Sequence, residues 1–258
     1  MIAFPDIDPI ALQLGPIAVR WYGLSYLSGL LGAWWLLKRR AKKGTISLRP
    51  EAVDDLIFYA TLGIVLGGRL GYVLFYNFSA LLDDPLMIVR VWEGGMSFHG
   101  GFIGVIVAMA MFARRESLGW FEVTDAIAPV APIGLGLGRL ANFINGELWG
   151  RVSDVPWAMV FPGAGDLPRH PSQLYQMMLE GVLLFVVLNL IYKLSPARRV
   201  LSGAFLVGYG TARFVVEFFR QPDAHIGFVL ANWMSMGQLL SLPMIVLGVV
   251  VIMMREKS

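Results

Sequence analysis

One polar stretch decides the fold: Gly138-Arg139-Leu140-Ala141-Asn142-Phe143-Ile144-Asn145-Gly146-Glu147-Leu148-Trp149-Gly150-Arg151. It follows the apolar run of residues 126–137, and with its flanks that run is long enough to lie within a bilayer. If the stretch is helical, Arg139, Asn142 and Asn145 recur every three residues and share one face. Charged and amide side chains at membrane depth are costly, so they usually face a bundle interior or a wet cavity. The stretch therefore predicts a functional site inside a helical membrane protein.

The side chains on that face favour an anion. A guanidinium with amide donors beside it suits the oxygens of a phosphate or a carboxylate. The alternative is that Arg139 pairs with a carboxylate only to lock two helices together. Such a pair would need neither both asparagines nor the glycine-rich exit of the stretch, so we favour the anion site.

The composition is that of a polytopic membrane protein. Of the 258 residues, 57% are hydrophobic and 15% are charged, and the mean hydropathy is +0.65. The absence of cysteine excludes disulfides, zinc–thiolate sites and a thiol nucleophile of the protein's own. Residues 1–15 lack a basic stretch before an apolar core, so we expect a short interfacial segment there and no cleavable signal peptide.

We predict an all-α integral membrane protein with seven transmembrane helices. The spans cover about residues 19–37, 55–76, 94–113, 123–144, 172–192, 202–219 and 233–254. Residues 1–258 form a single domain, because no repeat, linker or low-complexity tract divides them. The segment of residues 145–171 is too polar to span and too long for a turn, so we expect a small extracytoplasmic cap. At its end, Pro171 is expected at the first position of the next helix, with Ser172 helping to cap it.

Basic residues orient the chain, because lysine and arginine are enriched in cytoplasmic loops. The inner set comprises Lys38, Arg39, Arg40, Lys42, Lys43, Arg49, Arg114, Arg115, Lys193, Arg198, Arg199, Arg255 and Lys257, and the smaller outer set comprises Arg20, Arg90, Arg151, Arg169 and Arg220. The N-terminus is therefore expected outside and the C-terminus in the cytoplasm.

Further ionisable groups gather toward the outer half of the membrane. Arg213 and Glu217 are four residues apart on one helical face, so an intrahelical ion pair is expected. His99 precedes two glycines, which permit close approach of a backbone or a ligand, and its imidazole suits a general base or a hydrogen-bond donor. A histidine that merely packs helices is the alternative. For Arg69, which has glycines on both sides, a structural and a functional role stay equally open.

Several reaction classes lack support. The chain has no nucleophile elbow, no His-Glu-x-x-His and no phosphate-binding loop. Its carboxylates are not clustered as a divalent metal would require, so we expect neither a metal nor a cofactor. The remaining possibility is a cavity lined by arginines. Such a cavity would bind an anionic lipid headgroup, whose phosphate is then displaced.

Together these motifs resemble the prolipoprotein diacylglyceryl transferase family. The resemblance covers essentially the whole chain, and it rests on Arg20-Trp21-Tyr22-Gly23, His99-Gly100-Gly101, the stretch from Gly138 to Arg151, His170-Pro171-Ser172-Gln173-Leu174-Tyr175, and Tyr209-Gly210 with Arg213, Glu217 and Arg220. It implies a bacterial inner-membrane enzyme, with seven spans and a site open to the outer leaflet. Such an enzyme transfers the sn-1,2-diacylglyceryl group of phosphatidylglycerol to the lipobox cysteine of a prolipoprotein and releases glycerol 1-phosphate. The expected partners are these two substrates and the surrounding membrane lipids, with no nucleic acid.

The resemblance also implies roles for particular residues. The expected catalytic residues are His99, Arg139, Arg213, Glu147 and Glu217, and the expected substrate-binding residues are Tyr22, Asn142, Asn145, Gly150, Tyr209 and Arg220. The two catalytic arginines would hold the phosphate, and the histidine would assist deprotonation of the incoming thiol, with either glutamate as an alternative base. A transporter of an anionic solute and a non-catalytic lipid-binding scaffold are the competing hypotheses.

Overall fold

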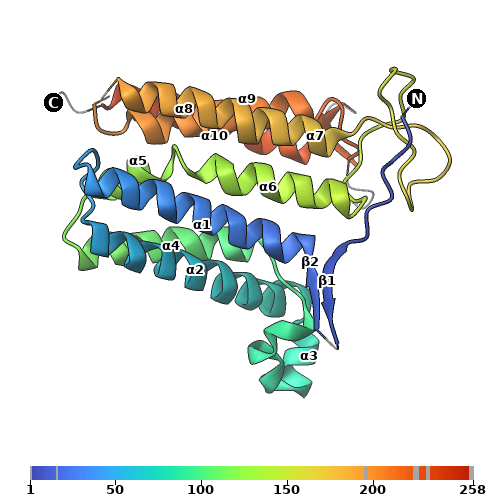
Figure 1. The fold of residues 1–258 in the computed structure, drawn as a ribbon, viewed down its shortest axis with the longest axis horizontal. Helices are drawn as coiled ribbons and strands as arrows, with labels where there is room; N and C mark the ends of the chain where they lie inside the picture. Colours follow the sequence, from blue (N-terminus) through green and yellow to red (C-terminus); the bar gives the residue numbers. More distant parts are fainter. Residues whose placement is uncertain (1, 16, 195–196, 223–226, 231–232, 256–258) are drawn as a thin grey trace. The chain divides into compact units, whose positions relative to one another are not determined.

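The computed structural model describes residues 2–15, 17–194, 197–222, 227–230 and 233–255 (Figure 1). The chain divides into two compact units: Met1–Leu36 with Asp125–Ser258 form the first unit, and Leu37–Thr124 form the second unit. Of the basic residues used to orient the chain, Lys257 lies outside the described residues.

The described residues are mostly helical. The elements in chain order are β1 (Ile10–Leu14), β2 (Ile17–Arg20), α1 (Trp21–Lys42), α2 (Pro50–Tyr76), α3 (Phe78–Asp83), η1 (Pro85–Val89), η2 (Val91–Glu93), α4 (Phe98–Arg115), α5 (Trp120–Ile127), α6 (Ala131–Ile144), α7 (Ser172–Gln176), η3 (Met177–Leu183), α8 (Leu184–Lys193), α9 (Val200–Val216), β3 (Phe228–Leu230), β4 (Met234–Ser235) and α10 (Met236–Met253). The strands form two separate antiparallel pairs, β1 with β2 and β3 with β4.

The helices make this a multi-pass membrane protein. Within the described residues, four helices are long and apolar enough to cross a bilayer, namely Pro50–Tyr76, Phe98–Arg115, Ser172–Lys193 and Met236–Met253, and the bent pair α5–α6 raises the number to five. The first and sixth of the seven predicted spans fall on α1 and on the shorter apolar helix α9, which are not among these four or five.

The fourth predicted span is a pair of helices rather than one continuous helix. The two helices α5 and α6 meet at an angle of 47° across residues 128–130. Pro132 stands in the first turn of α6, where its missing N–H is tolerated. At the break, the Asn189 side-chain amide donates to the Pro129 carbonyl oxygen over 2.9 Å. The break thus follows from two prolines, and an amide from α8 satisfies one of the freed carbonyls.

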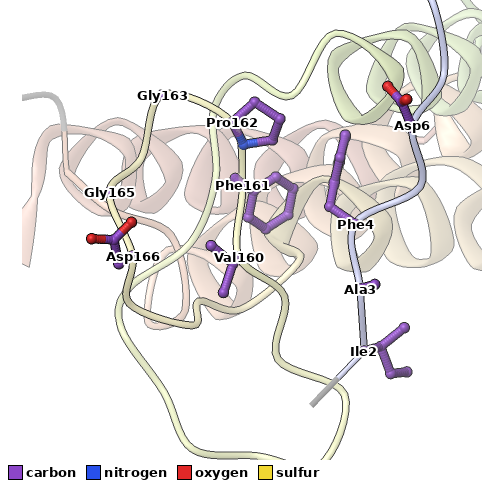
Figure 2. Close-up of a pocket in the computed structure, with 10 residues that line it drawn as sticks. All are labelled: Ile2, Ala3, Phe4, Asp6, Val160, Phe161, Pro162, Gly163, Gly165 and Asp166. Atoms are coloured by element: carbon purple, nitrogen blue, oxygen red, sulfur yellow. The ribbon is translucent and has the colours of Figure 1, made fainter.

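The N-terminal segment packs on the predicted cap. The Ile2 backbone N–H donates to the Ala158 carbonyl over 3.1 Å, and the Phe4 ring lies 5.3 Å from the Phe143 ring and 5.1 Å from the Phe161 ring. These segments line an open cavity of about 730 Å³. Figure 2 shows its lining residues: Ile2, Ala3, Phe4, Asp6, Val160, Phe161, Pro162, Gly163, Gly165 and Asp166. The expected interfacial segment is therefore held by aromatic packing against the cap.

Glycines set the approach of α2 to α4 in the second unit. Gly63, Gly67 and Gly71 recur every four residues on α2 and meet Gly100 and Gly104 of α4. A Cβ atom on Gly71 would lie 2.7 Å from the Gly100 Cα, and one on Gly67 would lie 2.8 Å from the Gly104 Cα. Membrane helices associate closely through such stripes of small residues.

Arg69 has a structural role. Its guanidinium is buried and donates to the backbone carbonyls of Met87 and Gly94. These contacts close the loop of η1 and η2 over the end of α2. Of the two interpretations left open for Arg69, the contacts support the structural one.

We expect Gly67→Ala to lower the stability of the protein, because the added methyl group overpacks the α2–α4 contact at a cost of about 1–3 kcal/mol. The matched control is Gly134→Ala on α6, where an added Cβ has nothing within 4 Å. That change should be neutral or slightly stabilising, because alanine is the better helix former. Thermal unfolding in detergent measures both. An equal effect of the two changes would contradict the close approach.

Candidate active site

Arg139, Asn142 and Asn145 share a face, as the spacing predicts. Arg139 Nη1 donates to Asn142 Oδ1 over 3.5 Å, and Asn142 Nδ2 donates to Glu147 Oε1 over 2.8 Å. Asn145 Nδ2 lies 3.5 Å from the same Glu147 oxygen. Gly146 adopts a φ of 66°, a conformation that glycine accepts without strain, and the resulting turn brings Glu147 back over the end of α6.

Glu180 completes this cluster, although it was not among the predicted site residues. Arg139 Nε lies 3.3 Å from Glu180 Oε2, and Arg213 Nη1 lies 3.9 Å from Glu180 Oε1. The Glu180 side chain is 0% exposed. The available signal was a single acidic residue within the apolar span of residues 172–192, because an ionisable group at membrane depth marks a functional site by default.

A wide helical turn presents Glu180 to α6. Residues Met177–Leu183 form a π-helix, η3, between the α-helical segments α7 and α8. On this turn Gly181 meets Gly136 of α6, and a Cβ on Gly181 would lie 2.6 Å from the Gly136 Cα. Short π-helical turns occur frequently at functional sites. The turn therefore combines close backbone packing with the placement of a buried carboxylate.

Arg213, Glu217 and Arg220 form the second half of the cluster. Arg213 Nη2 lies 2.6 Å from Glu217 Oε1, which confirms the intrahelical ion pair, and Arg220 Nη1 lies 3.5 Å from the same oxygen. The Ser235 hydroxyl donates to Glu217 Oε2. Ser235 is also the N-cap of α10, in a capping box with Gln238. Glu217 is thus buried among two guanidiniums and a hydroxyl.

Gly150 joins the cap to the end of α9 through its backbone. Its N–H donates to the His170 carbonyl over 2.9 Å, and it forms an isolated antiparallel bridge with Arg220. A Cβ there would lie 2.5 Å from the His170 carbonyl oxygen and 2.6 Å from that of Phe219. Next to it, the Arg151 guanidinium donates to the carbonyls of Glu217 and Arg220, each over 3.0 Å. Gly150 therefore supports the arginine cluster through its backbone.

The start of the next helix lies one residue later than expected. Pro171 is the residue before α7, which begins at Ser172. The Ser172 hydroxyl donates to the Leu148 carbonyl over 3.0 Å, and Gln173 Nε2 donates to the Glu147 carbonyl over 2.6 Å. Both side chains tie the helix start to the central stretch, so Ser172 bonds the neighbouring segment and not its own helix.

Tyrosines flank the cluster. Tyr209 on α9 interacts electrostatically with both Arg139 and Arg213. On α1, the Tyr22 hydroxyl lies 3.5 Å from that of Tyr26, which in turn lies near enough to Arg139 and Glu147 to interact with their charges. The predicted site residues of the first unit therefore belong to one connected set, in which Glu180 links the group around Arg139 to the group around Arg213.

His99 belongs to the second unit. It is the second residue of α4, its side chain is exposed, and its ring lies 5.7 Å from that of Phe98. Ser97 caps this helix by accepting from the Gly100 N–H over 3.2 Å. The local fold thus presents an accessible imidazole at a helix start.

Arginines dominate the buried part of the cluster. Three of them, Arg139, Arg213 and Arg220, face the buried carboxylates of Glu180 and Glu217, and Glu147 adds a third carboxylate beside Asn142. Arg213 Nη1 is buried and has no hydrogen-bond partner within the described part of the chain. Among the described residues, no group of three or more His, Asp or Glu side chains could hold a metal ion. Guanidinium donors in this arrangement suit the oxygens of an anion such as a phosphodiester.

A hydrogen-bond chain crosses the cap at His170. Trp157 Nε1 donates to the Tyr175 hydroxyl over 2.6 Å, and that hydroxyl lies 3.0 Å from His170 Nδ1. Because the indole can only donate, the tyrosine proton is free to bond His170 Nδ1, which then acts as the acceptor of a neutral ring. Burial lowers the pKa of His170 below its ordinary value, which also favours this neutral form.

The comparisons with known proteins agree on one family. The family model described as prolipoprotein diacylglyceryl transferase matches residues 9–254. A phosphatidylglycerol–prolipoprotein diacylglyceryl transferase of Methylococcus capsulatus is 53% identical over 98% of this chain and 97% of its own length. The proteins of that name from Vibrio vulnificus and Aeromonas hydrophila are 58% and 56% identical, over 96% and 98% of this chain and 91% and 92% of their own lengths.

We expect the neutral His170 to make stability depend on pH. The pKa in the folded state lies below the ordinary value of 6.5, so the unfolded chain binds the proton more tightly. This contribution is present above pH 6.5 and is lost as the pH falls through 6.5 toward the lower folded pKa. His170→Gln keeps an acceptor for Tyr175 and should remove that part of the pH dependence. Unfolding temperatures between about pH 8 and pH 5 test this, and parallel curves for the two proteins would contradict it.

Proposed function

The chain belongs to the prolipoprotein diacylglyceryl transferase family, and we propose that it transfers the sn-1,2-diacylglyceryl group of phosphatidylglycerol to a cysteine thiol of a prolipoprotein. The acceptor would be the lipobox cysteine, and the products a thioether-linked lipoprotein precursor and glycerol 1-phosphate. One observation carries the proposal: Arg139 and Arg213 both lie beside the buried Glu180, and Arg213 Nη1 has no hydrogen-bond partner among the described residues, so a guanidinium donor is available to a phosphate oxygen.

The arginines would act on the phosphate. Arg139 uses its Nε for Glu180 and donates from Nη1 to Asn142 over a long 3.5 Å. Arg213 Nη1, which has no hydrogen-bond partner among the described residues, supplies a further donor. Asn142, Asn145 and Tyr209 would orient headgroup oxygens, while Tyr22 and Gly150 shape the surroundings. Donors fixed before the reaction stabilise charge that develops during it.

The proposed chemistry is a displacement at the glyceryl carbon. The thiolate sulfur forms a bond to that carbon, and the bond from the carbon to the phosphate oxygen breaks. The bonding electron pair leaves with the phosphate oxygen. The phosphate group thereby changes from the monoanionic diester of phosphatidylglycerol to the dianionic monoester of glycerol 1-phosphate. The thiol proton goes to a base. The nucleophile belongs to the substrate, so the absence of cysteine in this chain is consistent with the reaction.

His99 is the proposed base, since an accessible imidazole can accept a proton near neutral pH. The contacts of Glu217 disfavour the alternative that it serves as the base, because two guanidiniums and a hydroxyl already surround its carboxylate. Glu147 accepts from two amides and remains the second candidate.

We further propose that the protein lies in the bacterial inner membrane as a single domain of seven spans, with the N-terminus outside. The basic last turns of α1 and α4, with Arg39, Arg40, Lys42, Arg114 and Arg115, support a cytoplasmic location for those ends. Residues 145–171 would then form an extracytoplasmic cap, and the arginine cluster would open toward the outer leaflet.

We expect Arg139→Ala to lower transfer by about 10²–10³-fold, the loss typical when one such donor is removed. The assay incubates the protein in detergent with phosphatidylglycerol and a lipobox peptide, and follows the peptide mass and the released glycerol phosphate. Arg139→Lys keeps the charge beside Glu180, so it serves as a second variant if alanine impairs folding. The control is Arg90→Ala, because Arg90 pairs with Asp84 outside the cluster.

The same assay separates the competing functions. A transferase releases glycerol phosphate only when the peptide carries its cysteine, so a Cys→Ala peptide should give neither product. Lipid binding without any mass change in the peptide would favour a scaffold. Uptake of an anionic solute into vesicles that contain the protein would favour a transporter. Full activity of a folded Arg139→Ala protein would refute the role assigned to Arg139.

We expect His99→Gln to lower the rate while phosphatidylglycerol binding is retained, because the base acts on the thiol and not on the phosphate. General-base catalysis typically contributes about 10²–10⁴-fold. Raising the pH toward the thiol pKa should restore part of the lost rate, since thiolate then forms without the base. An unchanged pH profile would leave Glu147 as the base, and Glu147→Gln would be the next variant.

A further inference from the structure

Glu180 is a buried charge to which the proposed reaction gives no role. Its carboxylate is 0% exposed and lies between two guanidiniums, 3.3 Å from Arg139 Nε and 3.9 Å from Arg213 Nη1. Burying a carboxylate is costly even when it is paired, and apolar packing would hold the same helices at less cost. A charge kept at this position therefore points to a role other than stability.

The two glutamates of the cluster have different geometry. Glu217 lies 2.6 Å from Arg213 on its own helical face and is satisfied by a second arginine and a serine. Glu180 reaches α6 and α9 from a third element, η3, and its two oxygens lie beside Arg139 and Arg213, respectively. Tyr209 also interacts with both arginines, but Glu180 is the charged group between them, so their relative position depends on it.

The contacts leave the arginines able to bind a ligand. Glu180 takes the Nε of Arg139, which is the nitrogen nearest the backbone, while Nη1 donates to Asn142 over a long 3.5 Å. At 3.9 Å, Arg213 Nη1 is attracted by the carboxylate but is too distant for a hydrogen bond. Both Arg213 Nη1 and Glu180 Oε1 are buried without a hydrogen-bond partner among the described residues. The carboxylate orients Arg213 without using the donor that a phosphate oxygen would take.

The backbone is shaped to deliver this carboxylate. The π-helical turn of Met177–Leu183 places Glu180 beside Gly181, which packs on Gly136 of α6. In a π-helix each residue turns less about the axis than in an α-helix, so restoring α-helical geometry would rotate the carboxylate away from its partners. The unusual turn and the buried charge share one explanation if both serve to fix the arginines.

We propose that Glu180 is a positioning residue that fixes the spacing of Arg139 and Arg213 and sets the charge of the phosphate site. This assignment rests on the proposed transferase function. Glu180 places one negative charge directly beside both arginines, so it weakens their attraction for the dianionic product more than for the monoanionic diester. The product is then released readily. Without that negative charge, the arginines would hold the dianion more tightly and retain it.

The test compares Glu180→Gln with Glu180→Asp, in the detergent assay with phosphatidylglycerol and a lipobox peptide. Glu180→Gln should lower kcat by about 10–100-fold, the range expected for small misplacement of catalytic groups, without raising the KM for phosphatidylglycerol. Glycerol 1-phosphate should inhibit this variant at concentrations about tenfold lower, because one more positive charge faces the dianion. Glu180→Asp keeps the charge, so it should restore wild-type product inhibition even where its shorter side chain lowers kcat.

Asp125→Asn is the matched control. Asp125 accepts from the backbone N–H groups of Arg199 and Ser202 at the opposite end of α9 from Arg213, so it is a structural carboxylate outside the cluster. Asp125→Asn should lower the unfolding temperature. It should leave kcat per folded molecule and the inhibition by glycerol 1-phosphate unchanged. If Glu180→Gln behaves like this control, or if its inhibition does not tighten, Glu180 is only structural and the assignment is overturned. An inactive wild-type protein would instead overturn the proposed function, and the assignment with it.

Discussion

A carboxylate held between two guanidiniums in an apolar span governs this structure. An isolated charge at membrane depth is costly, so Glu180, Arg139 and Arg213 must stay together once the helices are packed. The surrounding elements serve that requirement. The π-helical turn directs the Glu180 carboxylate toward α6 and α9, and small residues allow η3 to approach α6. Ser235, the N-cap residue of α10, supplies a hydroxyl to the second carboxylate, Glu217. The packing of the first unit and the chemistry of its site therefore depend on the same charges.

The site joins two kinds of support. Side chains from α6, η3 and α9 carry the charge, while the cap supports the segments that hold those side chains. Arg151 of the cap is an example, since its guanidinium donates to two carbonyls at the end of α9 and so fixes the segment that carries Glu217 and Arg220. A cap built in this way can vary in sequence on its outer surface while the geometry beneath it is preserved.

Much of the fold could be predicted because membrane helices have strong local signals. The apolar segments coincide with helices, and the spacing of Arg139, Asn142 and Asn145, like that of Arg213 and Glu217, predicted their shared faces. Departures from regular helical geometry were harder to predict from the sequence. Pro129 and Pro132 account for the break in the fourth span, but mean hydropathy over a window of residues does not reveal such a break. Glu180 was visible as a lone charge in an apolar run, yet its partners come from helices distant in sequence, and spacing within one helix does not reveal them. The pairing of the N-terminal segment with the cap depends on similarly distant contacts.

That last contact has a consequence for the order in which the protein assembles during synthesis. The second unit is continuous in sequence, so α2 and α4 can pack as soon as residue 124 has entered the membrane. The first unit combines residues that precede the second unit with residues that follow it: Ile2 is made before the second unit, but its partner Ala158 emerges only after α6 has been completed. The Phe4 ring likewise cannot pack until Phe143 and Phe161 have been made. During translation the segment of Ile2 and Phe4 therefore remains without these partners after all residues of the second unit have been made, and the arginine site cannot close before Arg213 and Glu217 follow.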